Sequence, residues 1–446
     1  MTTIEFSPST YQAAVSSGLC TPPGMLRKFI HIDRTRFHTL RAVGKLNSKL
    51  HLDHLRKRLP CSFFTELRSV LGLILLHAQT RFPAYRFLAP EYINEEWLAS
   101  VDWHKKFHRD HVLHQAMCVH VGFTLLQDLK VKNGENLLTY AARTLLRGQK
   151  TDYLRTAMHD MGCAGLLEHI RRLPDTHQQR FVSSYILEVF FLTALFHDLG
   201  YPWQFTGKIN AGLGTLAAVG SMPSMDPNTV IRHYGDRLLM MPFKNYIKND
   251  PTCPITWHEE FKAMVTKGLA NTHGLPGAIS FLHLNDQLRI YPGPAKPLGQ
   301  FGLEWAAMAI MMHDLGKMYA VVDKGRVQVY RSQLRVNFDR DPLSFLMTIT
   351  DLIQDYGRPD ASFIPNHDDV KITFRHRCAG TRIEWDETSR TLRIVYKYRN
   401  YADFKANKTL FLPETEQLYF DPLYGYLDPG SLDIRRIRLD AEHEVM

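Results

Sequence analysis

The sequence predicts a mainly helical protein with a small β-containing (α+β) module at its C-terminus. From about residue 63 to residue 196, apolar residues recur three and four positions apart, the period of a helix that buries one face. The same period returns in the segments GLEWAAMAIMMHDLGK and DPLSFLMTITDLIQDYGRP. After residue 367, apolar and polar residues alternate instead, which predicts strands.

These changes of pattern divide the chain of 446 residues into three parts. Residues 1–62 contain Pro-rich turns and predict a basic N-terminal arm or a helical preface. Residues 63–366 form the predicted helical domain, in which residues 201–270, rich in Gly, Pro, Met and Asn, predict an insertion or lid. Residues 367–446 form the C-terminal module, where DETSR is a plausible turn between two strands.

Two helices can be justified in more detail. RFVSSYILEVFFLTALF is apolar nearly all round, which predicts a buried helix. The helix that follows Asp341-Pro342 has an N-cap residue and a first-turn proline. In the C-terminal module, strands are predicted in VKITFRHR, on both sides of DETSR, and in SLDIRRIRL.

The composition narrows the functional classes. Apolar stretches such as residues 182–196 are shorter than the roughly 20 residues that cross a bilayer, and the N-terminus lacks the features of a secretory signal. Six scattered cysteines without a Cys-x-x-Cys pair predict reduced thiols rather than a disulfide framework or a thiolate zinc site. We expect a cytoplasmic protein with no membrane association; the sequence leaves the oligomeric state open.

The formal charge of +9 is concentrated near the N-terminus. Residues 27–58 carry ten Lys and Arg residues against only Asp33 and Asp53. Such a stretch could contact nucleic acid or an anionic ligand. A solvated basic face is the alternative, because the stretch lacks a regular run of aromatic residues that would stack on bases.

The chain twice ends an apolar helix on His-Asp-Leu-Gly, at His197-Asp198 and at His313-Asp314. An unpaired carboxylate is costly to bury, so a buried Asp is normally protonated, paired with a cation or bound to a metal. A third copy, His159-Asp160, follows a more polar segment and predicts a surface helix end.

Further histidines and carboxylates lie on other predicted helices. His108, His111 and His114 are spaced by three, so two of them could share a face. His273 stands at a helix start, and Asp351 interrupts an apolar helix face. Six candidate metal ligands result, each within or at the end of an apolar helix: His114, His197, Asp198, His273, His313 and Asp351.

Imidazoles with carboxylates suit Fe, Mn, Zn or Ni better than Mg or Ca. Six protein ligands exceed what one tetrahedral zinc ion requires. If all six converge, the natural arrangement is two divalent transition-metal ions, Fe or Mn first and Zn or Ni as alternatives, bridged by Asp198. A pair of this kind can generate hydroxide at neutral pH and bind a phosphoryl oxygen.

The order His, His-Asp, His, His, Asp, carried by RDHVLHQ, LFHDLGYP, HGLPGA, MMHDLGK and ITDLIQDYGRP, resembles the HD-domain superfamily of metal-dependent phosphohydrolases, in particular its dinuclear branch. The resemblance covers roughly residues 100–360. It implies a helical core, a dinuclear His/Asp metal centre and hydrolysis of a phosphomonoester or phosphodiester, often in a nucleotide. By position, His114 would be the first ligand, His197 and Asp198 the paired ligands, His273 and His313 ligands of the second metal, and Asp351 the last.

Other roles follow from position. Three residues are catalytic candidates: Asp198, which would also bridge the metals, His111 and Lys317. His111 could protonate a leaving group, and Lys317 could bind phosphate. Arg358 is a candidate for binding phosphate, and Tyr201 is a candidate for stacking on a base of the substrate. Packing and helix capping are the alternatives for these residues. Two other functions stay open, an HD-type diiron oxygenase and a non-catalytic regulator that binds a ligand or nucleic acid.

Overall fold

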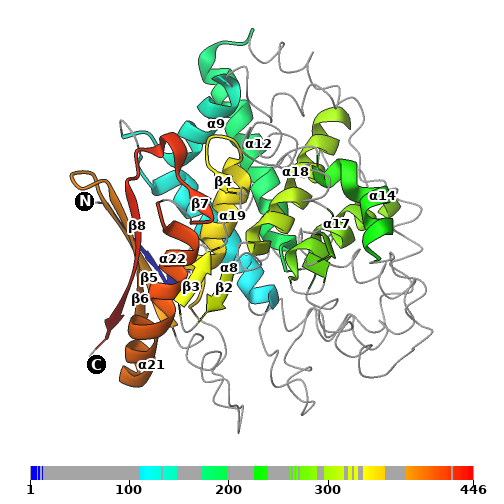
Figure 1. The fold of residues 1–446 in the computed structure, drawn as a ribbon. Helices are drawn as coiled ribbons and strands as arrows, with labels where there is room; N and C mark the ends of the chain where they lie inside the picture. Colours follow the sequence, from blue (N-terminus) through cyan, green and yellow to red (C-terminus); the bar gives the residue numbers. More distant parts are fainter. Residues whose placement is uncertain are drawn as a thin grey trace, which may run out of the picture.

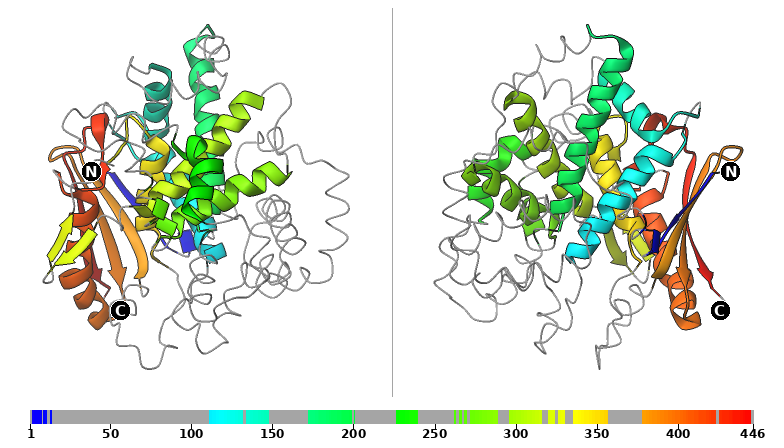
Figure 2. Two further views of the ribbon diagram at one scale, coloured as in Figure 1. Left: turned by 45° about the vertical axis from the view of Figure 1, so that its right-hand side comes forward. Right: turned by 180° about the vertical axis from the view of Figure 1, so that it is seen from behind.

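The computed structural model describes residues 2–7, 9–10, 13, 111–131, 134–147, 172–198, 200, 226–239, 262, 265–266, 268–269, 272–288, 296–315, 320–323, 326–329, 335–356, 378–422 and 425–444. Within these residues, a helical body lies beside a four-stranded sheet (Figure 1), and the two further views show the sheet at one side of the helices (Figure 2). The predicted mainly helical class is confirmed at this level, and the β-containing part is a small mixed sheet.

The helical body is built from seven helices of the described chain. They are α8 (His111–Asp128), α9 (Leu137–Arg147), α12 (Asp175–Phe196), α14 (Pro227–Leu239), α17 (Gly274–Leu288), α18 (Lys296–Leu315) and α19 (Pro342–Ile353). α12 packs against α8, α9 and α18, while α18 also packs against α17 and α19. The buried helix predicted near residue 190 is α12, whose Phe190 and Phe191 are almost fully buried. The core therefore lies between α8, α12, α18 and α19.

The start of α19 is fixed by capping. The Asp341 carboxylate accepts a hydrogen bond from the backbone N–H of Ser344 and, at 2.9 Å, from the indole N–H of Trp305 on α18. Pro342 occupies the first turn, where its missing N–H costs nothing. Burial raises the pKa of Asp341, and these hydrogen bonds oppose that rise. The predicted N-cap and first-turn proline are confirmed.

Strands and short helices make up the rest of the described chain. They are β1 (Thr2–Phe6), β2 (Ala320–Asp323), β3 (Arg326–Val329), β4 (Val336–Asn337), β5 (Cys378–Asp386), β6 (Thr391–Tyr398), α21 (Tyr401–Ala406), the π-helix η6 (Asn407–Phe411), α22 (Leu412–Phe420), β7 (Leu427–Asp428), the 3₁₀-helix η7 (Gly430–Leu432) and β8 (Arg436–His443). The main sheet has the order β1-β5-β6-β8, with β8 parallel to β6 and the other pairs antiparallel. The DETSR turn joins β5 to β6, as predicted.

The main sheet supports the C-terminal end of α19. The Tyr396 hydroxyl donates to the carbonyl of Leu352 at 2.7 Å, and the Thr381 hydroxyl donates to the carbonyl of Ile353 at 3.0 Å. The last carbonyls of a helix have no partner within the helix. These two bonds satisfy two of them, so the sheet holds the end of α19 that carries Asp351.

Two parts of the fold were not predicted. Residues 2–6, assigned to an arm or helical preface, form edge strand β1, which pairs with β5 across more than 370 positions of sequence. The hairpin β2–β3 lies inside the region predicted to be helical. The C-terminal module, predicted as α+β, contains α21 and α22 as well as strands. β1 was missed because five alternating residues carry little signal without the strand that they pair with.

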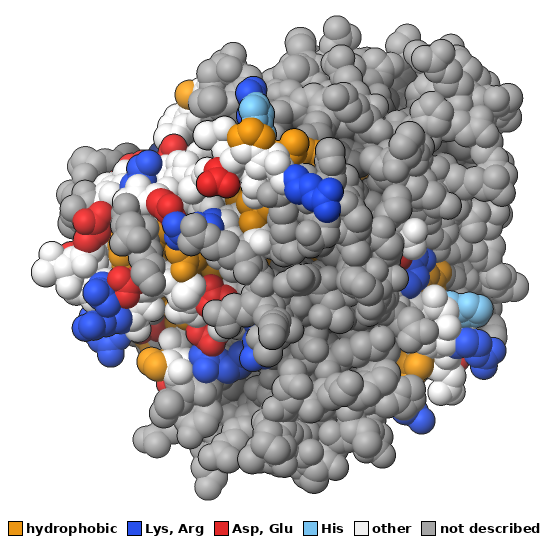
Figure 3. Space-filling view, turned by 90° about the horizontal axis from the view of Figure 1, so that it is seen from above, with side chains coloured by type: hydrophobic (Ala, Val, Ile, Leu, Met, Phe, Trp, Pro, Cys, Tyr) orange, Lys and Arg blue, Asp and Glu red, His pale blue; other side chains and the backbone are white. Residues whose placement is uncertain are grey.

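Acidic and basic side chains are interspersed on the described part of the face in Figure 3. On the main sheet, Arg382 bridges Glu384 on its own strand and Glu442 on β8, and Lys397 on β6 pairs with Glu5 on β1. The basic stretch at residues 27–58 lies outside the described residues. Among the described helices, none is both long enough and apolar enough to span a bilayer.

His120 on α8 is a buried histidine whose ring meets Phe6 of β1 edge-on, with centroids 5.9 Å apart. Burial lowers its pKa from 6.5 to about 4. Between these values the unfolded chain takes up a proton that the folded chain does not, so stability falls as the pH is lowered.

We expect the free energy of unfolding of wild type to fall by about 2–3 kcal/mol more than that of His120→Leu between pH 7 and pH 4.5, at about 1.4 kcal/mol per pKa unit. Urea unfolding at both pH values measures this, and equal losses would contradict it.

Candidate metal centre

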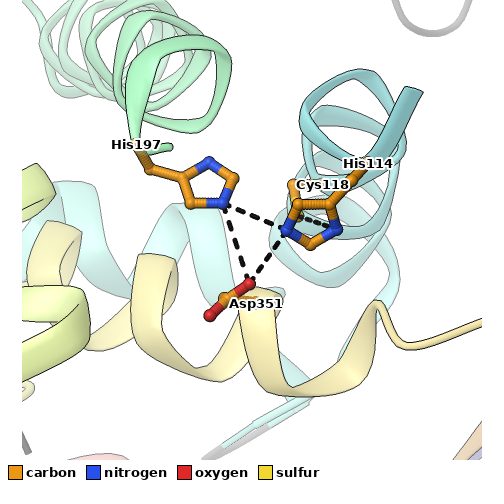
Figure 4. A group of neighbouring side chains, drawn as sticks. All are labelled: His114, Cys118, His197 and Asp351. Carbon is orange, nitrogen blue, oxygen red and sulfur yellow. Dashed lines mark hydrogen bonds and ion pairs between the residues drawn. The ribbon is translucent and has the colours of Figure 1, made fainter. Parts of the chain in front are cut away.

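The six candidate ligands lie together at the ends and faces of five helices. His114 is on α8, His197 and Asp198 follow the last residue of α12, and His273 directly precedes α17. His313 lies in the last turn of α18, and Asp351 lies in the last turn of α19. Figure 4 shows His114, His197 and Asp351 pointing toward one another from three helices.

Glycines allow these segments to approach each other closely. A Cβ atom on Gly200 would lie 1.8 Å from the carbonyl oxygen of His273, and one on Gly274 would lie 2.8 Å from the carbonyl oxygen of Ile310. Both contacts are to backbone atoms, which cannot rotate away. The turn after α12, the start of α17 and the end of α18 can therefore meet only because these positions lack side chains.

One half of the cluster is formed by His114, His197 and Asp351. The Nε2 atoms of the two histidines are 3.1 Å apart. The Oδ1 atom of Asp351 lies 3.0 Å from Nε2 of His114 and 3.7 Å from Nε2 of His197. Both histidines are buried, whereas the Asp351 side chain is 23% exposed. This half therefore reaches solvent at Asp351.

The other half is formed by His273 and His313, with Asp198 between the two halves. The Nε2 atoms of His273 and His313 are 3.0 Å apart. Oδ1 of Asp198 lies 3.2 Å from Nε2 of both His197 and His273, while its Oδ2 lies 3.6 Å from Nε2 of His114. Asp198 is buried. Its carboxylate thus faces histidines of both halves.

The second nitrogen of each imidazole is engaged by an acceptor. Nδ1 of His197 donates to the carbonyl of Ala194 at 2.7 Å, and Nδ1 of His313 donates to the carbonyl of Ile310 at 2.6 Å. Nδ1 of His273 faces Asp314 at 2.8 Å, and Nδ1 of His114 donates to the side-chain oxygen of Gln354. A neutral imidazole carries one proton, so a proton on Nδ1 leaves Nε2 as an acceptor. Four Nε2 acceptors and two carboxylates therefore converge.

Acceptor atoms that converge in a buried place need a proton or a cation between them. Burial lowers the pKa of His197, but the charges and hydrogen bonds of Asp198 and Asp351 outweigh burial and leave the pKa above its ordinary value. Burial, His273 and His197 lower the pKa of His313 to about 3. Burial raises the pKa of Asp351, but its hydrogen bonds to the two histidines outweigh burial, so the pKa lies well below its ordinary value. The donor set fits a metal ion: His114, Cys118, His197 and Asp351 form one group that could bind an ion, and His197, Asp198 and His313 form another.

Three neighbours of the cluster were assigned no role from the sequence. Gln354 orients His114, and its own side-chain N–H donates to the carbonyl of Tyr356 at 2.9 Å, which fixes which way the amide points. Asp314 contacts the Nδ1 atom of His273. The Sγ atom of Cys118 lies 3.7 Å from Nε2 of His114, one helical turn away on α8. The spacing of four residues between His114 and Cys118 was the sequence signal that could have identified Cys118.

The remaining predicted site residues are not placed. His111 begins α8, but its side chain is not among those described. Lys317, Arg358 and Tyr201 lie outside the described residues, as do His159 and Asp160. Their predicted roles stay predictions. Comparison of the chain with family profiles, with curated proteins and with solved structures yields no match.

The glycine contacts lead to a prediction for Gly200→Ala. The added methyl group would overlap the backbone of His273, so the segments that carry the ligands must separate. We expect a loss of about 3 kcal/mol in the free energy of unfolding together with weaker metal binding, measured by urea unfolding and by elemental analysis.

Gly302→Ala is the matched control. Its Cβ would lie 2.9 Å from the Tyr185 hydroxyl and 3.1 Å from Cγ2 of Val189, both side-chain atoms rather than backbone, so the cost is expected to be smaller, about 1 kcal/mol. An unchanged unfolding midpoint in Gly200→Ala would show that close approach at this glycine is not required.

Proposed function

We propose that the protein is an HD-type metal-dependent phosphohydrolase that acts on a nucleotide or another phosphoester. The observation that carries the proposal is the convergence of four imidazole acceptors and two carboxylates from five helices, in the order His, His-Asp, His, His, Asp. This order is the one that resembles the HD-domain superfamily.

The number and kind of donors favour two transition-metal ions. Four nitrogen and two carboxylate ligands exceed the needs of a single tetrahedral ion, and nitrogen donors favour Fe, Mn, Zn or Ni over Mg and Ca. His114, His197 and Asp351 would hold one ion, and His273 and His313 the other, with Asp198 shared. When bound, such a pair supplies a nucleophilic hydroxide and neutralises charge on a phosphoryl group.

The chain itself contributes orientation and access. The four Nδ1 contacts fix each ring and leave each Nε2 as the acceptor atom that a metal would bind. Five of the six side chains are at most 4% exposed, which excludes water from most of the centre. Asp351, at 23% exposure, marks the open side, and a phosphoester would approach there.

We expect close to two metal ions per chain in protein purified without chelator or affinity metal. His197→Ala should lose bound metal and lower phosphate release from nucleotides and p-nitrophenyl phosphates, assayed with Mn²⁺ or Fe²⁺, more than a hundredfold, because metal-ion catalysis supplies several kcal/mol. His273→Ala should retain about one ion. The measurements are elemental analysis and phosphate release.

His120→Leu is the matched control, because His120 is a buried histidine on the same helix as His114 but is outside the cluster. It should keep the metal content and activity of wild type. Full activity in His197→Ala would end the site assignment. Oxygen consumption without phosphate release would favour the diiron oxygenase, and a wild type that binds no metal after reconstitution would favour the non-catalytic regulator.

A further inference from the structure

The second His-Asp pair does not repeat the arrangement of the first. At the first pair, both His197 and Asp198 face the convergence point, with Nε2 and Oδ1 3.2 Å apart. At the second pair, Nε2 of His313 faces His273, but the Asp314 carboxylate contacts the opposite nitrogen of the His273 ring. Asp314 therefore lies behind a ligand rather than among the ligands.

Asp314 binds His273 at two points. Its Oδ2 atom accepts a hydrogen bond from the backbone N–H of His273 at 3.0 Å and lies 2.8 Å from Nδ1 of the same residue. Asp314 is 2% exposed. Because one carboxylate oxygen contacts both the backbone and the ring, it fixes the position of His273 as well as the orientation of its imidazole.

The two halves of the centre differ in what stands behind their imidazoles. His114 is backed by the neutral amide of Gln354, whereas His273 is backed by a carboxylate. A carboxylate behind a ligating imidazole fixes the tautomer and raises the basicity of the ligand, and removing such a partner commonly lowers metal affinity about ten- to a hundredfold. His197 and His313 are backed by backbone carbonyls, which no side-chain substitution removes.

We propose that Asp314 is a positioning residue that holds His273 as its Nδ1–H tautomer and so sets the metal affinity of the half formed by His273 and His313. This inference rests on the proposed dinuclear centre. Asp314 is not a ligand, and the half formed by His114, His197 and Asp351 binds its ion without it. The repeated His-Asp thus supplies two ligands at its first occurrence, and one ligand and one positioning carboxylate at its second.

The test is a titration of metal-free protein with Mn²⁺ by calorimetry, comparing wild type with Asp314→Asn. The substitution keeps the size of the side chain but removes its charge. We expect one site of unchanged affinity and one weakened about ten- to a hundredfold. Glu188→Gln is the matched control: Glu188 is a buried carboxylate on α12, nine residues before His197, and both affinities should stay at wild-type values.

Nitrogen chemical shifts of labelled histidine give a readout that needs neither metal nor the variant. In metal-free wild type, His273 should be protonated on Nδ1 and not on Nε2, and an Nε2–H tautomer would overturn the proposal. Two wild-type affinities in Asp314→Asn would overturn the role of Asp314 and leave the proposed function intact. A wild type that binds no Mn²⁺ would overturn the dinuclear centre and the role of Asp314 together.

Discussion

The organisation of the helical core depends on one electrostatic constraint, the burial of hydrogen-bond acceptors that face one another. The Nε2 atoms of His273 and His313 lie 3.0 Å apart, and those of His114 and His197 lie 3.1 Å apart. In each pair, a carboxylate oxygen lies within 3.2 Å of one of the two Nε2 atoms. Acceptors at this separation attract only through a shared proton or cation. The rigid helices and close glycine contacts around them hold an arrangement that the side chains alone would not adopt.

The same local device orients a histidine at the end of two helices. The last carbonyls of a helix lack partners within it. In the last turn of α12, the carbonyl of Ala194 is one such group, and it accepts the Nδ1 proton of His197. In α18, the carbonyl of Ile310, likewise three residues earlier in the chain, accepts the Nδ1 proton of His313. Both bonds aim Nε2 outward. This explains why the sequence places both histidines directly after an apolar run, where the helix ends.

The ligand candidates could be chosen from the sequence because each is a polar residue that interrupts or ends an apolar helix. Their role as ligands stays a prediction, but the structure places all six side chains together. Gln354 could not be chosen, because its contact with His114 joins positions 240 residues apart and no local pattern encodes such a pairing. Asp314 was noticed as part of the second His-Asp pair but was given no role, because the resemblance supplies only His313 of that pair as a ligand. Strand β1 was missed for the same reason as Gln354, because the strand that it pairs with is distant in sequence.

The acceptor cluster also couples the proposed metal to folding. Without a cation, the fold must bring ionised carboxylates and imidazoles together in a buried place, which opposes folding. A metal ion that binds the folded chain and finds no preformed site in the unfolded chain adds its binding free energy to stability. The candidate ligands come from five helices that meet in one core, so this free energy would act on the contacts among α8, α12, α17, α18 and α19 together. A metal bound at the proposed site would therefore hold the helical core together as well as serve the chemistry.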